Sequence, residues 1–350
     1  MKEQLLQRIN SIVSDPAYSV REVLFQLKNL LYESDFEQAL NNESKDISLL
    51  INNNISLIQN GDKQQNFIQT GFKEFDTYFG GFAYGEFVVI GGRPSMGKTQ
   101  LLVNLSINIS QKMSVLYFSF DLSEASLTSR FISSVAEIPI QNLLQYKLTT
   151  EERKRLGALE GKFDRHKIFI NDSCNNSVSA FKQQCIKHIK ENGVRVIIVD
   201  YLQLMSSNRY RNSRDLEISF ISQELKSVAK EYNVCVIASS QLSRAVEARS
   251  NSRRPVLTDL RDSGGIEQNA DKVIFLYRPE YYGLTTADDG TDTEGMAEVI
   301  LAKNRNGMLG SIRINRDANF TNFRDYVGFT KEFSFFKNRI SELEDGDDPF

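Results

Sequence analysis

Short apolar runs rich in β-branched and aromatic residues alternate with longer amphipathic stretches between Thr70 and about Asp325. The runs are EFVVIGG, SVLYFSF, KIFIND, VRVIIVD, VCVIASSQ, DKVIFLY and AEVILAKNR. Apolar runs separated by helical stretches are typical of a mostly parallel sheet that helices cover on both faces. The pattern therefore predicts an α/β domain, which we bound at residues 67–330. Because ligands of such sheets bind at the carboxyl ends of the strands, functional residues are expected where each run stops.

The first 58 residues show helical periodicity instead. Segment 2–14 carries one apolar stripe, a second follows Ser19, and ISLLINNNISLI at 47–58 forms a third. Glu22 stands three residues after Ser19, as in a capping box. A polar linker, QNGDKQQN at 59–66, precedes the core. Such short helices bury too little surface for an independent domain, so they form either a cap on the core or an arm, or linker helices, that bury their stripes on a neighbouring subunit.

Composition narrows the class of protein. The chain has 350 residues, of which 41% are apolar and 25% charged, as in ordinary globular proteins. It has no run of about 18 apolar residues, so no membrane partner is expected. Three cysteines without close spacing and two histidines argue against zinc, and unpaired thiols suit the cytoplasm. The net charge of −3 neither indicates nor excludes nucleic acid, and the acidic stretch 340–350 is predicted to be disordered.

The most specific motif is GGRPSMGKT, which contains Gly92-x-x-x-x-Gly97-Lys98-Thr99 between a predicted strand and a predicted helix. In such a phosphate-binding loop the glycines let the backbone approach, the lysine neutralises the β- and γ-phosphates, and the hydroxyl ligates Mg²⁺. The expected nucleotide-binding residues are Gly92, Pro94, Ser95, Met96, Gly97, Lys98, Thr99 and Gln100.

Polar residues at three other strand ends complete a candidate site. VRVIIVD ends in Asp200, the expected partner of Thr99 in holding Mg²⁺. SVLYFSF is followed by Asp121, which could polarise an attacking water, and VCVIASSQ ends in Gln241, which could sense the γ-phosphate. Each of these residues alone could be a solvated strand end. Together with the phosphate loop they predict an ATP-hydrolysis centre with ATP and Mg²⁺ as cofactors.

Longer motifs resemble the C-terminal ATPase domain of the DnaB family of replicative hexameric helicases. The most specific are RRPVLTDLRDSGGIEQNAD and KNRNG, and TGFKEFDTYFGG, FSFDLSEASLTSR and VIIVDYLQLM match in the same order over residues 67–325. The resemblance implies a RecA-like P-loop core, a ring of six subunits and ATP bound between neighbours. It also implies the family roles for Lys98, Thr99, Asp200 and Gln241.

Two basic residues after the last long run match the family's finger, which reaches the γ-phosphate held by the neighbouring subunit. They are Lys303 and Arg305 of LAKNRNG. A guanidinium brought across an interface would stabilise the charge of the transition state. The alternative is that Arg305 forms only a surface ion pair.

Single-stranded DNA is expected along two basic loops, 206–215 and 244–265, which leave the carboxyl edge of the predicted sheet. Tyr210 is the one aromatic residue there, so the loops are expected to follow the phosphate backbone with little sequence preference. The resemblance places DNA contacts at the LRESG positions, and glycines there would let amides approach a phosphate. The candidate DNA-binding residues are Arg261, Asp262, Gly264, Arg244, Arg253 and Arg254. Some of these arginines could instead belong to a solvated face.

Two departures from the family pattern bear on function. The family has glutamate where Asp121 stands, and a shift of about 1 Å in a catalytic group can cost around a hundredfold in rate. Glu124 could help, although we expect it to cap the following helix. About 60 residues precede the core, which suits a linker helix but not the family's complete helical collar. Primase binding through that collar is therefore left open.

Three functions remain under consideration. The first is an ATP-driven, ring-shaped DNA helicase of replication, a homo-oligomer and by resemblance a hexamer, with primase, a loader or other replication proteins as candidate partners. The second is a nucleotide-gated scaffold that clamps DNA but hydrolyses ATP slowly. The third, a RecA- or KaiC-like ATPase, would have no reason to carry both DLRDSGGIEQNAD and KNRNG.

Overall fold

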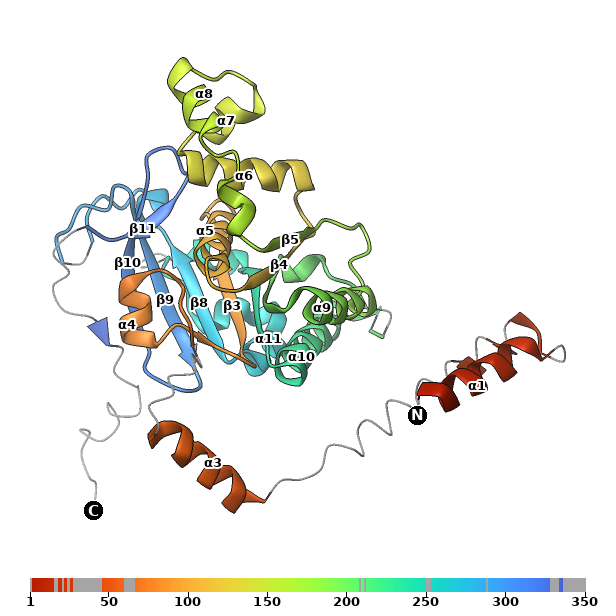
Figure 1. Ribbon diagram of the computed structural model, residues 1–350. Helices are drawn as coiled ribbons and strands as arrows, with labels where there is room; N and C mark the ends of the chain where they lie inside the picture. The colour runs from red at the N-terminus through yellow and green to blue at the C-terminus, as the bar shows by residue number, and fades with distance from the viewer. Residues whose placement is uncertain are drawn as a thin grey trace, which may run out of the picture. The chain divides into compact units, whose positions relative to one another are not determined.

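The computed structural model describes residues 2–15, 18–20, 22–23, 26–27, 46–59, 67–207, 209–210, 212–249, 253–287, 289–327 and 334–335. The chain divides into two compact units, residues 1–64 and 65–350 (Figure 1). Of the linker predicted at 59–66, Gln59 is the last residue of α3, and residues 60–66 lie outside the described residues, as does the acidic stretch 340–350. Within the described part, no helix combines the length and the apolar character that crossing a membrane needs.

Helices form the N-terminal unit. α1 spans Lys2–Ser14 and α3 spans Ile47–Gln59. The capping box predicted between Ser19 and Glu22 is confirmed, because the Ser19 amide and hydroxyl donate to Glu22 Oε2 at 2.8 and 2.6 Å. Much of the second apolar stripe lies outside the described residues. The apolar side chains of α3 that the structure describes are exposed, Leu49 by 64% and Ile51 by 48%.

A ten-stranded sheet forms the centre of the larger unit, in the order β11-β10-β9-β8-β3-β7-β6-β4-β5, with β12 paired to β10. The parallel strands are β3 (Phe87–Gly92), β4 (Ser114–Ser119), β5 (Ile168–Asn171), β6 (Val194–Asp200), β7 (Cys235–Gln241) and β8 (Lys272–Tyr277). The antiparallel strands are β9 (Met296–Asn304), β10 (Gly310–Arg316), β11 (Phe323–Asp325) and β12 (Ser334–Phe335). A separate pair joins β1 (Phe67–Ile68) to β2 (Phe82–Ala83). The predicted mostly parallel α/β sheet is confirmed.

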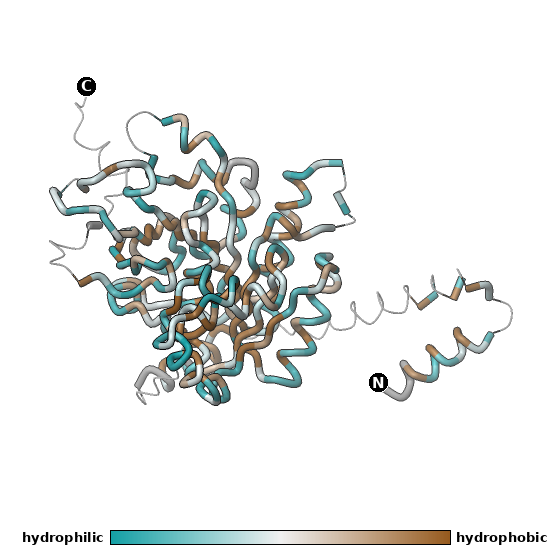
Figure 2. Tube along the Cα trace, turned by 90° about the horizontal axis from the view of Figure 1, so that it is seen from above, coloured by the Kyte–Doolittle hydropathy of each residue, from teal (hydrophilic) through white to brown (hydrophobic). Residues whose placement is uncertain are grey.

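Two apolar cores lie on opposite faces of this sheet, because alternate residues of each strand point to opposite sides. Val88 and Ile90 of β3 belong to one core, whereas Phe87 and Val89 belong to the other. Helices α4 (Lys73–Phe79), α5 (Lys98–Ser110) and α6 (Glu124–Ala136) supply the first core, and α9 (Val178–Asn192), α10 (Arg214–Tyr232) and α11 (Gly264–Asn269) the second. In Figure 2 the apolar residues gather in the interior of this unit.

The remaining elements are short. They are helices α7 (Ile140–Leu144) and α8 (Thr150–Gly157) and the 3-10 segments η1 (Lys162–Arg165), η2 (Leu202–Leu204), η3 (Arg244–Ala248), η4 (Leu257–Ser263) and η5 (Pro279–Tyr282).

Strand direction decides which chain segments meet. Gly92 pairs with Gln241, and Ser119 pairs with Asp200, so the ends of these four parallel strands share one edge of the sheet. β9 is antiparallel to β8, and its last residue, Asn304, pairs with the first residue of β8. The segment after β9 therefore begins at the opposite edge.

Candidate nucleotide-binding site

A strand, a tight loop and a helix form the phosphate-binding motif. β3 ends at Gly92 and α5 begins at Lys98. Gly97 has φ 100°, a left-handed conformation that favours glycine, and a Cβ there would lie 2.9 Å from the Phe323 ring. Lys98 Nζ donates to the carbonyl oxygens of Gly92 at 2.7 Å and Arg93 at 3.1 Å. The ammonium group is thus held beside a helix N-terminus, where amides and dipole favour an anion.

Asp200 is the most tightly bound side chain of the site. It is 4% exposed, and its carboxylate accepts from the hydroxyls of Thr99 at 2.8 Å, Ser239 at 2.5 Å and Tyr117 at 3.0 Å. Burial and the neighbouring Asp200 charge raise the pKa of Tyr117, so the phenol remains a donor. A hydroxyl beside a fixed carboxylate is the hard-oxygen donor set that Mg²⁺ prefers. Thr99 and Asp200 therefore fit the predicted metal.

A cavity of about 400 Å³ opens over these groups. The predicted site residues that line it are Pro94, Ser95, Gly97, Lys98, Thr99, Gln100, Asp121, Asp200 and Gln241. Of the other two residues predicted for the loop, Gly92 lies at the end of β3 and Met96 packs its side chain into the apolar core. The parallel topology thus brings the predicted phosphate, metal and water-positioning residues to one cavity.

Electrostatics in the cavity centre on Lys98. Burial lowers the pKa of Lys98 to about 8, against the opposing effect of the Asp200 and Asp121 carboxylates. Tyr201 also lines the cavity and contacts the Gln241 side chain. Burial, and then the Asp121 and Asp200 charges, raise the pKa of the Tyr201 phenol. An anion entering the cavity would favour the charged form of Lys98.

Several cavity residues escaped the sequence prediction. Arg130 of α6 lines the cavity, and its buried Nε has no hydrogen-bond partner within the described part of the chain. The turn between β10 and β11 contributes Phe320 and Asn322, and Gln100 donates to the Thr321 carbonyl at 2.6 Å. Arg130 belongs to α6, the helix that follows Asp121 along the chain. Its place in the sequence could therefore have indicated a cation near the phosphates. The turn carries no motif, and only the strand order brings it here.

Glu124 does not cap α6, contrary to the expectation. The cap is Ser123, whose hydroxyl accepts from the Ser126 amide at 3.3 Å, and the Glu124 amide donates to Asp172 at 2.8 Å. A hydroxyl caps better here because its short side chain reaches the free amides of the first turn. Asp121 and Asp200 are the two acidic residues that line the cavity, as far as the chain is described.

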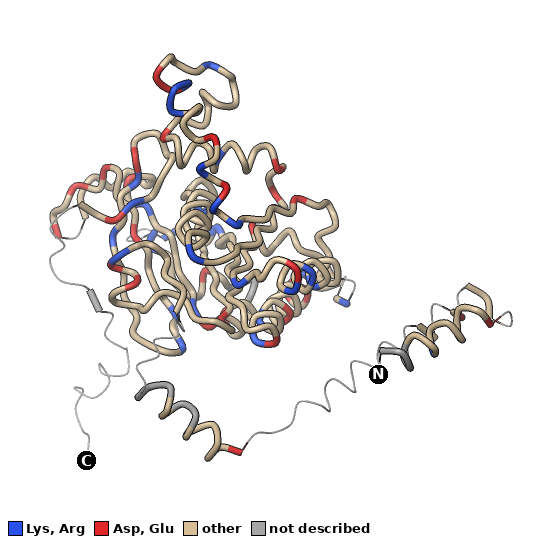
Figure 3. Tube along the Cα trace, viewed as in Figure 1, with Lys and Arg blue, Asp and Glu red and all other residues tan. Residues whose placement is uncertain are grey.

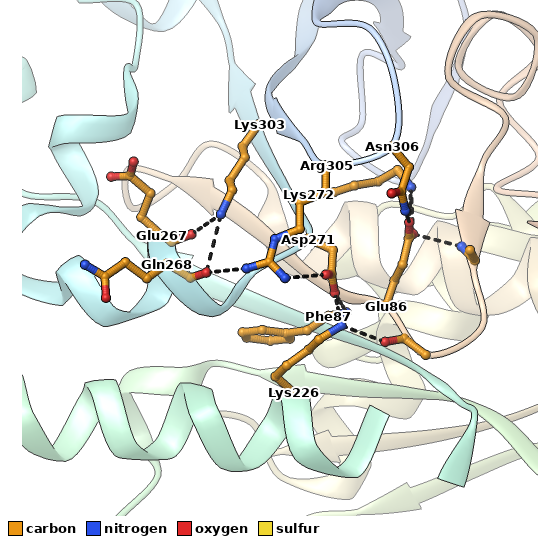
Figure 4. A network of polar contacts seen from close by, with 12 residues as sticks. Glu86, Phe87, Lys226, Glu267, Gln268, Asp271, Lys272, Lys303, Arg305 and Asn306 are labelled. Carbon is orange, nitrogen blue, oxygen red and sulfur yellow. Dashed lines mark hydrogen bonds and ion pairs between the residues drawn. The ribbon is translucent and has the colours of Figure 1, made fainter. Parts of the chain in front are cut away.

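Strand pairing places Lys303 and Arg305 at the opposite edge of the sheet from the phosphate loop. Figure 4 shows their contacts there. The Arg305 guanidinium contacts Asp271 at 3.1 Å and the Gln268 carbonyl at 2.7 Å, and Lys303 contacts the Glu267 carbonyl at 2.5 Å. The two edges are separated by the length of β3, on the order of 16 Å. Arg305 thus has an ion pair within its own subunit, neither basic residue lines the nucleotide cavity of that subunit, and both the finger and the surface ion pair remain predictions.

The predicted DNA-binding arginines differ in their surroundings. Arg244 and Arg253 are exposed, and the Arg253 guanidinium lies 5.2 Å from the Tyr282 ring centroid. Arg254 is held by Glu298 at 2.7 Å and by the Ser311 hydroxyl at 3.0 Å. Arg261 and Asp262 lie in η4, but their side chains are outside the described part of the chain. Residue 211 of the loop 206–215 is also outside it. Figure 3 shows acidic and basic residues interspersed over this unit.

The two glycines at the start of α11 have different roles. A Cβ on Gly265 would lie 2.1 Å from the Ser219 hydroxyl of α10, so the glycine is required for helix packing. A Cβ on Gly264 would meet nothing within 4 Å among the described residues. Helix packing is thus a sufficient reason for glycine at position 265, whereas phosphate approach at Gly264 and Gly265 remains a prediction.

Comparison with known proteins agrees with this geometry. The family described as DnaB-like helicase C terminal domain matches residues 67–325. A "Probable replicative DNA helicase" of Trieres chinensis is 39% identical over 74% of this chain and 57% of its own length. The "Replicative DNA helicase DnaC" of Bacillus subtilis (strain 168) is 36% identical over 87% of this chain and 64% of its own length. The chain thus spans about 60% of the length of these relatives.

Solved structures show the same fold. One, described as an ATPase domain, matches with a TM-score of 0.73 and 32% identity, over 81% of this chain and all of that one. A second, "The Structure Of A DnaB-Like Replicative Helicase And Its Interactions With Primase", matches with a TM-score of 0.72 and 30% identity, over 93% of this chain and 76% of that one. The predicted RecA-like P-loop core is confirmed by these neighbours. The chain belongs to the DnaB-like helicase C-terminal domain family.

Proposed function

We propose that this chain is the motor of a ring-shaped, ATP-driven DNA helicase that moves along single-stranded DNA and unwinds the duplex in replication. The observation that carries the proposal is the division of catalytic groups between two edges of one sheet. Lys98, Thr99 and Asp200 meet in a cavity at one edge, whereas Arg305 lies at the other. Only a second subunit can bring the Arg305 guanidinium to the cavity, as in a ring. The replicative helicases among the relatives agree with this function.

In the cavity each residue has a separate task. Lys98 neutralises charge on the β- and γ-phosphates, and Thr99 and Asp200 would hold Mg²⁺, which would supply further positive charge to offset that of the phosphates. Asp121 orients the attacking water, and Gln241 detects the γ-phosphate. Lys303 and Arg305 of the neighbour stabilise the charge that spreads over the transferred group.

The strand that ends in Gln241 leads through Leu242 and Ser243 into the proposed DNA-binding loop, residues 244–265. Arg93 of the phosphate loop connects to the same loop, because its guanidinium donates to the Leu242 carbonyl at 2.8 Å and to Glu247 at 2.9 Å. ATP binding and DNA binding would therefore move a shared segment. The DNA contacts we propose are Arg244, Arg253, Arg261, Asp262 and Gly264. The ion pair of Arg254 with Glu298 favours a structural role for Arg254.

The partners we propose follow from this function. They are single-stranded DNA, five further copies of the chain, and replication proteins such as primase and a loader. We also propose a cytoplasmic location, because the three cysteines are unpaired thiols, which suit a reducing compartment.

A second candidate function is a nucleotide-gated DNA clamp. The observation in its favour is Asp121, one methylene shorter than the family's glutamate at the position that should orient water. The test measures ATP turnover with and without single-stranded DNA, beside strand displacement, and compares it with the Lys98→Ala variant. DNA-stimulated turnover with displacement supports the helicase, whereas DNA binding without displacement supports the clamp. Loss of less than about tenfold in Lys98→Ala, under roughly 1.4 kcal/mol of barrier, contradicts the site itself. Filaments in place of rings in electron micrographs would favour a RecA-like ATPase.

A further inference from the structure

The edge of the sheet opposite the nucleotide cavity carries a network of charged side chains, shown in Figure 4. Lys272 bonds both carboxylate oxygens of Glu86 at 2.6 Å, and the two residues are 2% and 4% exposed. Asp271 is 5% exposed and pairs with Lys226 and Arg305. Lys272, Glu86, Asp271 and Lys226 are thus fixed at the edge that carries Arg305. Arg305 is the residue that we assign to the ATP site of the neighbouring subunit.

The two carboxylate oxygens of Asp271 have different partners: one bonds β3 and α10, and the other faces Arg305. Its Oδ2 accepts from the Phe87 amide at 2.7 Å and from Lys226 at 2.6 Å, which ties it to β3 and α10. Its Oδ1 faces the Arg305 guanidinium at 3.1 Å. The Asp271 backbone adds two more bonds, to the Phe87 carbonyl at 2.8 Å and from the Arg305 amide at 3.0 Å. The carboxylate can hardly rotate, so Oδ1 stays directed at Arg305.

Arg305 is held firmly but not covered. One terminal nitrogen contacts Asp271 and the other contacts the Gln268 carbonyl, while the side chain is 46% exposed. A guanidinium has five N–H donors, so these contacts are compatible with others to a phosphate. Asn306, the next residue, contacts Glu86 at 3.4 Å, which fixes the chain on the far side of the finger.

We propose that Asp271 is a positioning residue for catalysis in the neighbouring subunit, acting through Arg305. An arginine loses much rotational freedom when it is fixed, and Asp271 imposes that order before the γ-phosphate arrives. The inference rests on the proposed function, because it assumes that Arg305 acts between subunits. It predicts that Asp271 affects the ATP held by the next subunit and not the ATP held by its own.

Subunit mixing separates these two possibilities. A Lys98→Ala subunit has a defective loop and an intact finger, and an Arg305→Ala subunit has the reverse. We expect Asp271→Asn rings to lower kcat about tenfold with KM for ATP unchanged. When Asp271→Asn subunits are mixed with Lys98→Ala subunits, turnover per intact phosphate loop should recover, because the Lys98→Ala subunits supply an intact finger. When they are mixed with Arg305→Ala subunits, turnover should not recover, since both subunits then lack a working finger.

Two controls keep the test sharp. Glu152→Gln removes a buried carboxylate of α8, 6% exposed, whose partners are Asn142 and the Thr149 amide and not a residue of the finger, and it should leave kcat within about twofold. If Asp271→Asn fails to assemble, the double variant with Lys226→Gln removes anion and cation together, leaves no unpaired buried charge and replaces it in the mixtures.

The opposite mixing pattern, recovery with Arg305→Ala but not with Lys98→Ala, would overturn the inference. So would faster turnover in Asp271→Asn rings, which would mean that the carboxylate restrains the finger. An equal loss in Glu152→Gln would mean that kcat follows the general stability of the fold and not the position of the finger. Failure of Lys98→Ala and Arg305→Ala to complement each other, in rings shown to be mixed, would instead contradict the shared site and hence the proposed function.

Discussion

At the scale of single residues, the protonation of Lys98 links ATP binding to pH. Burial lowers its pKa to about 8 from an ordinary value of 10.5, so above pH 8 the free protein holds it increasingly neutral. Bound triphosphate favours the charged form, and ATP binding must then take up a proton. We expect the Kd for ATP to rise about tenfold per pH unit between pH 8 and 10. A fluorescent ATP analogue titrated across this range measures the slope.

The matched control for this prediction is Lys98→Arg. A guanidinium does not titrate in this range, so its Kd should stay flat with pH even if its affinity differs. A flat profile for the parent protein would show that Lys98 remains charged without ligand.

Asp121 gives the second prediction at this scale. Asp121→Asn removes the charge at nearly constant size, and hydrolysis should fall by about 10²–10⁴, the usual value of general base catalysis. ATP and DNA binding should survive, because Lys98 holds the phosphates. Turnover assays beside filter binding distinguish the two effects. Normal hydrolysis in Asp121→Asn would place the base elsewhere.

The reverse substitution tests whether the aspartate is a handicap. Asp121→Glu restores the length found in the family, and turnover should at least equal that of the parent. Much slower turnover would mean that the pocket is built around the shorter side chain.

The sequence was sufficient for the residues that end strands or follow a local motif. Lys98 and Thr99 belong to one contiguous loop, and Asp121, Asp200 and Gln241 follow apolar runs, so parallel topology alone places them together. Tyr117 and Ser239 bond Asp200 from inside neighbouring strands, where they look like ordinary buried positions. Their role depends on strand register, which no periodicity encodes.

At the scale of elements, the packing of α11 on α10 depends on one glycine. A Cβ at position 265 would lie 2.6 Å from the Ser219 Cα, so Gly265→Ala forces backbone to move. Overpacking of this kind costs about 1–3 kcal/mol in unfolding free energy. Urea unfolding measures it, with Gly264→Ala as the control.

Gly264 is a close match for Gly265, since it begins the same helix and its added Cβ meets nothing within 4 Å among the described residues. Alanine there should leave stability unchanged or raise it slightly. Equal losses in both variants would contradict the packing argument. Weaker DNA binding by Gly264→Ala, at unchanged stability, would support the proposed phosphate approach at this position.

Strand direction explains why the sequence alone did not decide where the finger, Lys303 and Arg305, lies relative to the phosphate loop. The apolar run that ends in Lys303 resembles the other runs, yet it forms an antiparallel strand. Its direction sends Arg305 to the edge opposite the phosphate loop, and that reversal separates the two halves of the catalytic machinery. A run's composition does not state its direction, so the resemblance alone suggested the separation.

At the scale of the whole molecule, the N-terminal helices present apolar side chains to solvent. Leu49 and Ile51 of α3 are exposed by 64% and 48%, and surfaces of this kind mark interaction sites. Both interpretations of this segment, cap or arm, remain predictions. If the stripes are buried between subunits, deleting residues 1–60 should lower the assembly state seen by light scattering, while circular dichroism shows a folded core.

A pair of point variants makes the same prediction without removing chain. Leu49→Asp places a charge in the apolar stripe of α3, whereas Asn52→Asp places the same charge at an exposed polar position one helical turn away. If the stripe is buried between subunits, Leu49→Asp should dissociate at concentrations where Asn52→Asp remains assembled. The reason is that burying an unpaired charge costs free energy. Equal masses for both variants and for the deletion would show that assembly does not depend on this surface. A loss of stability in Leu49→Asp, at unchanged mass, would show that the helix packs on its own core.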